Sequence, residues 1–139
     1  MKLTFDQSQC FSVPEKLLNI LNTELTKLTG TQPDSTGITF NFRDPDYSAD
    51  TGGYHPVEIR VTKHMELWQF EYITDFCFEG FPYPELVKDI DVCFHTQKIY
   101  TQFDISMSKQ EADDFFSMFL NNFISYVEMG VFTVKVTFD

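Results

Sequence analysis

The sequence predicts an α+β protein built on a mainly antiparallel, twisted sheet of about six strands. Two patterns support this prediction. Apolar and polar residues alternate in several short segments, which is typical of strands with one buried face. Near the two ends of the chain, apolar residues recur three or four positions apart, which is typical of amphipathic helices. The links between successive strands are too short for helical crossovers. We therefore expect antiparallel neighbours, an N-terminal and a C-terminal helix packed on one face, and a final C-terminal strand.

Length and composition indicate a single domain that spans residues 1–139. A chain of this length can bury about two thirds of its unfolded surface around one core. Aromatic residues make up 17% of the chain, and sixteen of them are phenylalanine. Because each aromatic side chain buries a large area, we expect a dense, aromatic core.

Each predicted helix begins with a capping-box pattern, in which a serine is followed three residues later by a glutamate. Ser12 and Glu15 start the first helix, and Ser108 and Glu111 start the second. The apolar face of the first helix is a stripe of leucines: Leu17, Leu18, Leu21, Leu25 and Leu28. The apolar face of the second consists mainly of Phe115, Phe116, Phe119, Phe123 and Val127.

Strands are expected at residues 38–43, 57–62, 66–79, 90–95, 99–105 and 131–139. In the longest segment the apolar side chains occupy even positions from Trp68 to Phe78, which predicts one aromatic face. Residues 63–64 are expected to form the turn before it. The segment from Gly80 to Pro84 contains two prolines, which cannot donate to a sheet ladder, and is expected to be a loop.

Between the first two strands, Asp44 to Pro56 forms a polar loop with two consecutive glycines, three aspartates, two tyrosines and a histidine. Loops of this length are uncommon in compact domains, and those that are ordered are usually functional. We therefore expect a binding surface at this loop, joined by the proline-rich loop that follows the third strand. The candidate binding residues are Asp44, Asp46, Tyr47, Asp50, Gly52, Gly53, Tyr54, His55, Glu58, Phe81 and Tyr83.

The chain is strongly acidic, with 10 Lys and Arg against 21 Asp and Glu and a formal charge of −11. Such a surface repels phosphate backbones, which argues against a nucleic-acid partner, and it suits basic partners. No apolar run is long enough to span a bilayer or to form a signal peptide. The three cysteines form neither a disulfide framework nor a zinc motif. We expect a cytoplasmic protein with reduced thiols, no membrane association and no cofactor.

The run from Phe42 to Ile59, FRDPDYSADTGGYHPVEI, resembles the signature of a small bacterial family of unknown function, found mainly in Vibrio and related gammaproteobacteria. The resemblance covers essentially the whole chain. That family is similar in structure to the mitochondrial acidic matrix glycoprotein family, whose members form ring-shaped trimers and bind diverse partners, including complement. The resemblance implies a twisted antiparallel sheet flanked by terminal helices, and it implies no catalytic residue.

Two features of the loop have both a ligand-binding and a structural interpretation. Asp44, Asp46 and Asp50 could offer oxygen ligands to calcium, but the EF-hand spacing is absent, and aspartates in turns commonly bond their own backbone. Gly52 and Gly53 could form an anion nest, but the lysine and the following helix of a phosphate loop are missing. A requirement for positive φ is the better explanation of a glycine pair. The sequence therefore favours the structural roles and predicts no metal site.

Two side-chain pairs could carry chemistry. His55 and Glu58 could act as base and orienter if His55 still lies in the loop, because residues three apart in a strand point to opposite faces. The alternative is a buried or backbone-bonded histidine. Cys93 and His95 share one face of a strand, but acidic neighbours disfavour a thiolate and no third group is evident. No catalytic residue is predicted.

The favoured function is a non-enzymatic protein-interaction module that uses residues 44–56 and 81–84 to bind an unknown protein partner. The sequence leaves open whether the protein is a homo-oligomer. Phe81 and Tyr83 either contact that partner or cover the open end of the sheet. The alternative function is a small enzyme or ligand-binding domain with a pocket under the loop, lined by Asp46, Tyr47, Tyr54 and His55. An acidic mimic of nucleic acid is disfavoured, because the carboxylates are scattered rather than arranged in rows.

Overall fold

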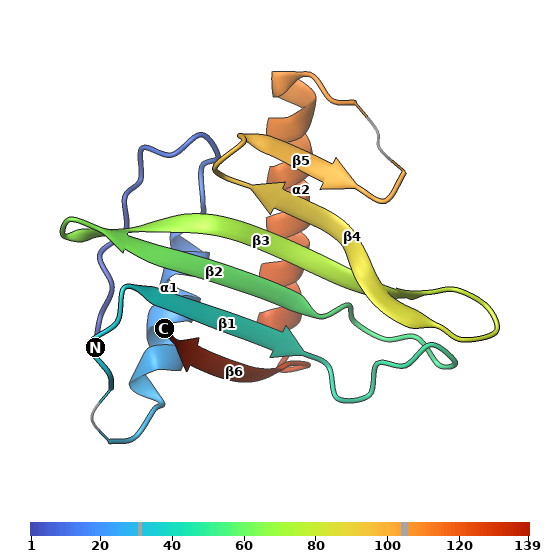
Figure 1. The fold of residues 1–139 in the computed structure, drawn as a ribbon, viewed down its shortest axis with the longest axis horizontal. Coiled ribbons are helices and arrows are strands. Elements are labelled where there is room, and N and C mark those ends of the chain that lie inside the picture. The colour runs from blue at the N-terminus through green and yellow to red at the C-terminus, as the bar shows by residue number, and fades with distance from the viewer. Residues whose placement is uncertain (31, 104–105) are drawn as a thin grey trace.

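The structure is a computed structural model that describes residues 1–30, 32–103 and 106–139 (Figure 1). The described residues form two helices and six strands. Their order is α1 (Glu15–Thr26), β1 (Gly37–Arg43), β2 (Val57–His64), β3 (Leu67–Glu79), β4 (Glu85–Cys93), β5 (Lys98–Thr101), α2 (Lys109–Glu128) and β6 (Thr133–Phe138). This confirms the predicted α+β class, with a helix near each end and a strand last. Neither described helix is long and apolar enough to cross a membrane.

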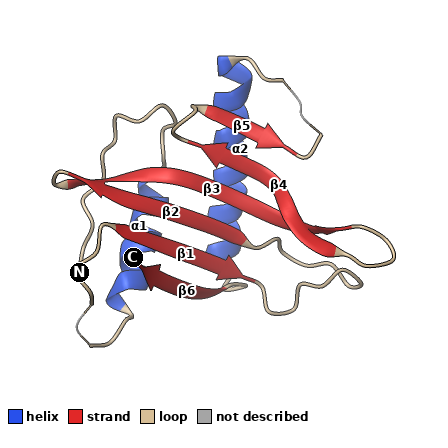
Figure 2. Ribbon diagram, in the orientation of Figure 1, coloured by secondary structure: helices blue, strands red, loops and turns tan. Residues whose placement is uncertain are grey.

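The six strands form one sheet in the order β5-β4-β3-β2-β1-β6, and each pairing between these described strands is antiparallel (Figure 2). β1 to β5 are neighbours in the sheet in the same order as in the sequence, because short loops can join only antiparallel neighbours. After β5 the chain passes through α2 and returns as β6, which pairs with β1. α2 therefore carries the chain from one edge of the sheet to the other.

The core lies between the sheet and the two helices, which lie on the same face of the sheet (Figure 1). β1 and β2 contribute alternate residues: Ile38, Phe40, Phe42, Val57, Ile59 and Val61. The helices contribute leucines, phenylalanines and an isoleucine, among them Leu17, Leu21, Leu120 and Phe123. The rings of Phe42 and Phe123 meet edge to face with centroids 5.0 Å apart, a geometry that the ring quadrupoles favour. The N-terminal segment adds Leu3, Phe5 and Phe11, which no periodicity in the sequence indicated.

The alternation of β3 breaks at Glu71. This residue has no partner in β2, because the register between the two strands slips by one position at this point. Trp68 and Phe70 are buried before the bulge, whereas Ile73 is the first side chain to enter the core after it. One extra residue reverses the face that each following side chain takes. The prediction of a single aromatic face at the even positions from 68 to 78 is therefore wrong beyond Phe70.

The two helix starts differ in their caps. α1 begins at Glu15 with Pro14 at the N-cap, and no side chain caps it, so the capping box predicted at Ser12 is wrong. Ser12 lies two residues before the position from which a side-chain oxygen reaches the free N–H groups. The capping box predicted for α2 is confirmed: the Ser108 hydroxyl accepts the N–H of Glu111, and the Glu111 carboxylate accepts the N–H of Ser108.

Several strand boundaries also differ from the prediction, and three of them matter for the loops. β2 continues through His64, and the turn falls at Met65, whose φ is 57°, rather than at residues 63–64. β4 starts at Glu85 rather than at residue 90, because its non-alternating first half pairs with the end of β3. β5 ends at Thr101 rather than at residue 105, and residues 104 and 105 lie outside the described residues.

Candidate functional site

The loop from Asp44 to Pro56 is organised by its first residue. The Asp44 side chain is buried, with only 8% of the residue exposed. One carboxylate oxygen accepts the N–H of Asp46 at 2.9 Å, and the other accepts the N–H of Tyr54 at 3.0 Å. Asp44 thus ties the beginning of the loop to its end. It plays the structural role that aspartates take in turns rather than that of a calcium ligand.

The tip of the loop is closed by a small bridge. Ser48 and Gly52 exchange backbone hydrogen bonds of 3.2 and 2.9 Å. Gly52 and Gly53 have φ values of +71° and +134°, which side-chain-bearing residues rarely adopt. A Cβ atom on Gly53 would lie 2.9 Å from a carboxylate oxygen of Asp44, so no side chain fits there. Asp50 is exposed at this tip, as is Asp46 nearer the start of the loop.

Tyr47 fastens the loop to β3. Its ring stacks on that of Phe78 with centroids 5.2 Å apart, and its hydroxyl accepts the N–H of Phe78 at 3.0 Å. It lines a shallow hollow of about 180 Å³ together with Pro56 and Leu86. Tyr47 is not among the described residues that line the groove described below, but its ring lies beside that of His55, with centroids 5.5 Å apart. It holds the loop against the sheet next to that histidine.

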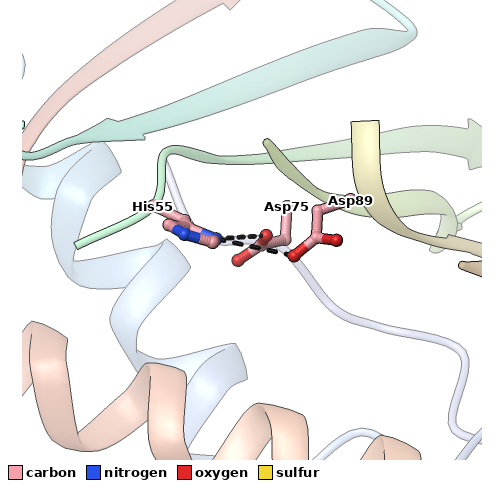
Figure 3. Close-up of side chains that lie close together, drawn as sticks. All are labelled: His55, Asp75 and Asp89. Atoms are coloured by element: carbon pink, nitrogen blue, oxygen red, sulfur yellow. Dashed lines mark hydrogen bonds and ion pairs between the residues drawn. The ribbon is translucent and has the colours of Figure 1, made fainter. Parts of the chain in front are cut away.

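His55, at the end of the loop, meets two aspartates from neighbouring strands (Figure 3). Its Nδ1 lies 2.9 Å from Oδ1 of Asp75 on β3 and 3.7 Å from Oδ2 of Asp89 on β4. Asp89 has no partner in β3, because the register slips between the pairs Asp75–Ile90 and Phe76–Lys88. Bulges of this kind re-aim a side chain. Here the bulge brings Asp89 to the same site as Asp75.

These three side chains line a groove of about 410 Å³ beside α2. Tyr54 and Tyr126 form part of its wall, and their ring centroids lie 4.7 Å apart. Its other walls are mostly apolar and include Phe119 and Phe123. None of the described residues that line the groove is Lys or Arg. The site therefore combines a concave apolar surface with convergent polar groups, as ligand-binding sites do.

The charges of the cluster are coupled. The hydrogen bond to Asp75 raises the pKa of His55 above its usual value, although burial opposes this. Burial raises the pKa of Asp75, and the hydrogen bond to His55 opposes that shift. With both carboxylates ionised, the three side chains carry a net charge of −1 when His55 is protonated and −2 when it is neutral. A cation is thus favoured at this position.

Other predicted residues lie elsewhere. Glu58 is on the opposite sheet face from the groove, where it accepts a hydrogen bond of 2.7 Å from the Tyr72 hydroxyl. It does not orient His55; Asp75 does. Phe81 and Tyr83 lie in the β3–β4 loop with 98% and 85% of each residue exposed, so they do not cover the sheet end.

Sequence reasoning found His55 and Tyr54 but missed Asp75 and Asp89. Asp75 was assigned to the polar side of β3, because the bulge at Glu71 that reverses the alternation leaves no mark in the sequence. Asp89 depends on a second bulge between β3 and β4. Asp75 lies within a predicted strand, where aspartate is disfavoured, and this was the one available signal. Asp89 precedes the strand predicted from residue 90, so no strand pattern singled it out.

The fold and site define an antiparallel α+β protein with a histidine–aspartate cluster in a groove beside its long helix. The chain belongs to the family described as protein of unknown function (DUF2787), which matches residues 15–137. Among curated proteins no match was found.

Two solved structures from Vibrio cholerae are similar to this chain. The hypothetical protein VC0508 from the VSP-II pathogenicity island is 33% identical, with a TM-score of 0.87 and coverage of 99% of this chain and 100% of that one. The conserved hypothetical protein VC1805 from pathogenicity island VPI-2 is 27% identical, with a TM-score of 0.72 and coverage of 93% and 97%. VC1805 is described as sharing structural homology with the human P32 protein. The family resemblance inferred from the loop motif is therefore confirmed.

Proposed function

We propose that this protein is a non-enzymatic protein-interaction module that binds its partner with the loop of residues 80–84 and the adjoining loop of residues 44–56. The observation that carries the proposal is the exposure of two aromatic side chains, Phe81 and Tyr83, in one short loop. Water-exposed aromatic side chains are costly unless a partner covers them, and they are common anchors of interfaces.

The two loops form one continuous surface. Both lie at the same end of the sheet (Figure 1). Tyr47 of the first loop stacks on Phe78 near the end of β3, and Leu86 at the start of β4 lines the same hollow. These contacts support the proposal that the partner meets both loops at once.

The surroundings of the aromatic pair indicate the chemistry of the partner. Glu79 and Glu85 flank the hairpin loop and are exposed, and Asp46 and Asp50 are exposed on the neighbouring loop. An apolar anchor surrounded by carboxylates suits a partner segment that combines apolar and basic residues. The three free cysteines fit a cytoplasmic setting for this partner.

The test is capture from a cell lysate with immobilised protein. The double variant Phe81→Ser/Tyr83→Ser removes the anchors, and Phe103→Ser serves as the matched control, because Phe103 is an equally surface-placed aromatic (80% exposed) on a different loop. We expect the wild type and the control to retain the same proteins, which the double variant loses and which elute as salt is raised. If the double variant retains the same proteins as the wild type, the proposed surface is wrong. Sedimentation of the same samples decides whether the partner is a second copy of the chain.

A second candidate function is binding of a small ligand in the groove beside α2, which Tyr54, His55 and Tyr126 favour by converging there. Asp46 and Tyr47, which were expected in the same pocket, are not among its described lining residues. Replacing Tyr126 with alanine opens one wall of the groove. We expect this change to weaken binding of the ligand and to leave the β3–β4 hairpin loop unchanged. A screen by thermal shift with the wild type and Tyr126→Ala tests this function, and a screen without any stabilising compound would count against it.

A further inference from the structure

We propose that His55, Asp75 and Asp89 bind a divalent first-row transition-metal ion in the groove. The proposal goes beyond the interaction function and uses a different surface. The metal-ligating atoms of the three side chains all lie within 4.8 Å of one another. They come from the β1–β2 loop and from β3 and β4, and they point toward one another (Figure 3).

The spacing of these atoms fits coordination. Ligand atoms about 2.0–2.2 Å from one ion lie roughly 3.0–3.5 Å apart in tetrahedral or octahedral geometry. Nδ1 of His55 lies 2.9 Å from the nearest oxygen of Asp75 and 3.7 Å from that of Asp89. The carboxylate oxygens of Asp75 and Asp89 lie within 4.8 Å of one another, so the two side chains would close on an ion by rotating toward it.

The charge of the site is a separate argument for a cation. The Asp75 side chain is only 11% exposed, yet its one described ion-pair partner is His55. Asp89 depends on the same histidine. One imidazole cannot neutralise two carboxylates, whereas a divalent ion with a neutral imidazole does so. A nearly buried carboxylate beside a second carboxylate is costly without that ion.

The donor set selects the class of ion. An imidazole nitrogen favours zinc, copper, iron or nickel over calcium and magnesium, which prefer oxygen alone. Three protein ligands leave at least one coordination position for water or for a group in the groove. The ligands are held by the sheet: Asp75 by its strand, Asp89 by the bulge, and His55 by the entry into β2 at Val57. Ligands fixed in this way bind with little reorganisation.

The test is isothermal titration of the full chain with ZnCl₂, after removal of bound metal with EDTA and dialysis. We expect wild type to bind one ion per chain. Asp89→Asn keeps the bond between His55 and Asp75 and replaces a partly exposed carboxylate, so it should fold; we expect its affinity to fall tenfold or more. His55→Gln should abolish binding at this site. The matched control is the double variant Cys93→Ser/His95→Gln, which removes a cysteine and a histidine that are close in sequence but outside the cluster. We expect it to bind zinc as tightly as the wild type.

A second readout places the ion. Mn²⁺ broadens the NMR signals of nearby nuclei, and we expect the amides of Asp75, Asp89 and Tyr54 to broaden first in wild type. Thermal unfolding in EDTA tests whether each variant is folded. If His55→Gln does not fold, the metal affinity of Asp89→Asn alone decides the test. The proposal is overturned if wild type takes up no ion saturably. It is equally overturned if Asp89→Asn and His55→Gln bind as tightly as wild type, which would leave the cluster as an ion pair alone.

Discussion

Replacing Asp44 with asparagine should destabilise the protein by about 2 kcal/mol. The buried Asp44 carboxylate accepts two hydrogen bonds, one from the N–H of Asp46 and one from that of Tyr54. Hydrogen bonds to charged groups contribute about 1.5–3 kcal/mol each. Asparagine keeps the shape and one acceptor, but its NH₂ group faces the second donor, so one bond is lost and the other becomes neutral. Alanine loses both bonds, and we expect it to cost about 3 kcal/mol.

The assay is urea unfolding followed by the fluorescence of Trp68, the single tryptophan, which is 5% exposed in the core. The free energy of unfolding comes from the midpoint and slope of the transition. Asp50→Asn is the control, because that aspartate is exposed in the same loop and its replacement should change stability by less than about 0.5 kcal/mol. If Asp44→Asn is as stable as Asp50→Asn, Asp44 does not organise the loop, and the account of this site fails.

Three further predictions use the same unfolding assay or a simple chemical one. Gly53→Ala should lower the free energy of unfolding by about 3 kcal/mol, because φ at this position is +134° and the added Cβ would meet Asp44. Gly52→Ala should lower it by about 1 kcal/mol, because the Cβ there would point into open space. Equal losses at the two positions would contradict the geometry. Ser108→Ala should lower the free energy of unfolding by about 1 kcal/mol, because it removes the serine of the α2 capping box. An unchanged free energy of unfolding would mean that the capping box contributes nothing. Burial raises the pKa of Cys77 to about 11. In a variant whose other two cysteines are serine, alkylation by iodoacetamide should therefore be slow at neutral pH and accelerate as the pH rises toward that value; fast reaction at neutral pH would show that the thiol is open to solvent.

The fold was predictable where one rule holds over a whole element. β1 and β2 keep strict alternation from Ile38 to Phe42 and from Val57 to Val61, so the buried face could be assigned directly. The start of α2 was predictable because its capping box involves residues only three positions apart. The face of β3 was not, since the bulge at Glu71 depends on its pairing with β2 rather than on local sequence.

The site was predictable only in its loop half. Tyr54 and His55 stand in a loop whose composition indicated function, whereas the carboxylates that meet His55 come from strands later in the chain. Asp75 reaches the groove because of one bulge and Asp89 because of another. Cross-strand register sets both positions, and a single sequence does not specify it.

Each of the two bulges places one carboxylate out of the alternation of its strand, Glu71 in β3 and Asp89 in β4. The two carboxylates differ in their partners. Glu71 meets Arg60 at 2.8 Å, so its charge is neutralised by a guanidinium within the protein. Among the ion pairs of the described residues, the partner of Asp89 is His55, which is already bonded to Asp75. Bulges commonly re-aim a side chain toward a structural or functional contact. Glu71 has a counter-charge of its own within the fold, whereas Asp89 shares its one described ion-pair partner with Asp75. This difference is the physical reason to look for a metal ion beside Asp89 and not at Glu71.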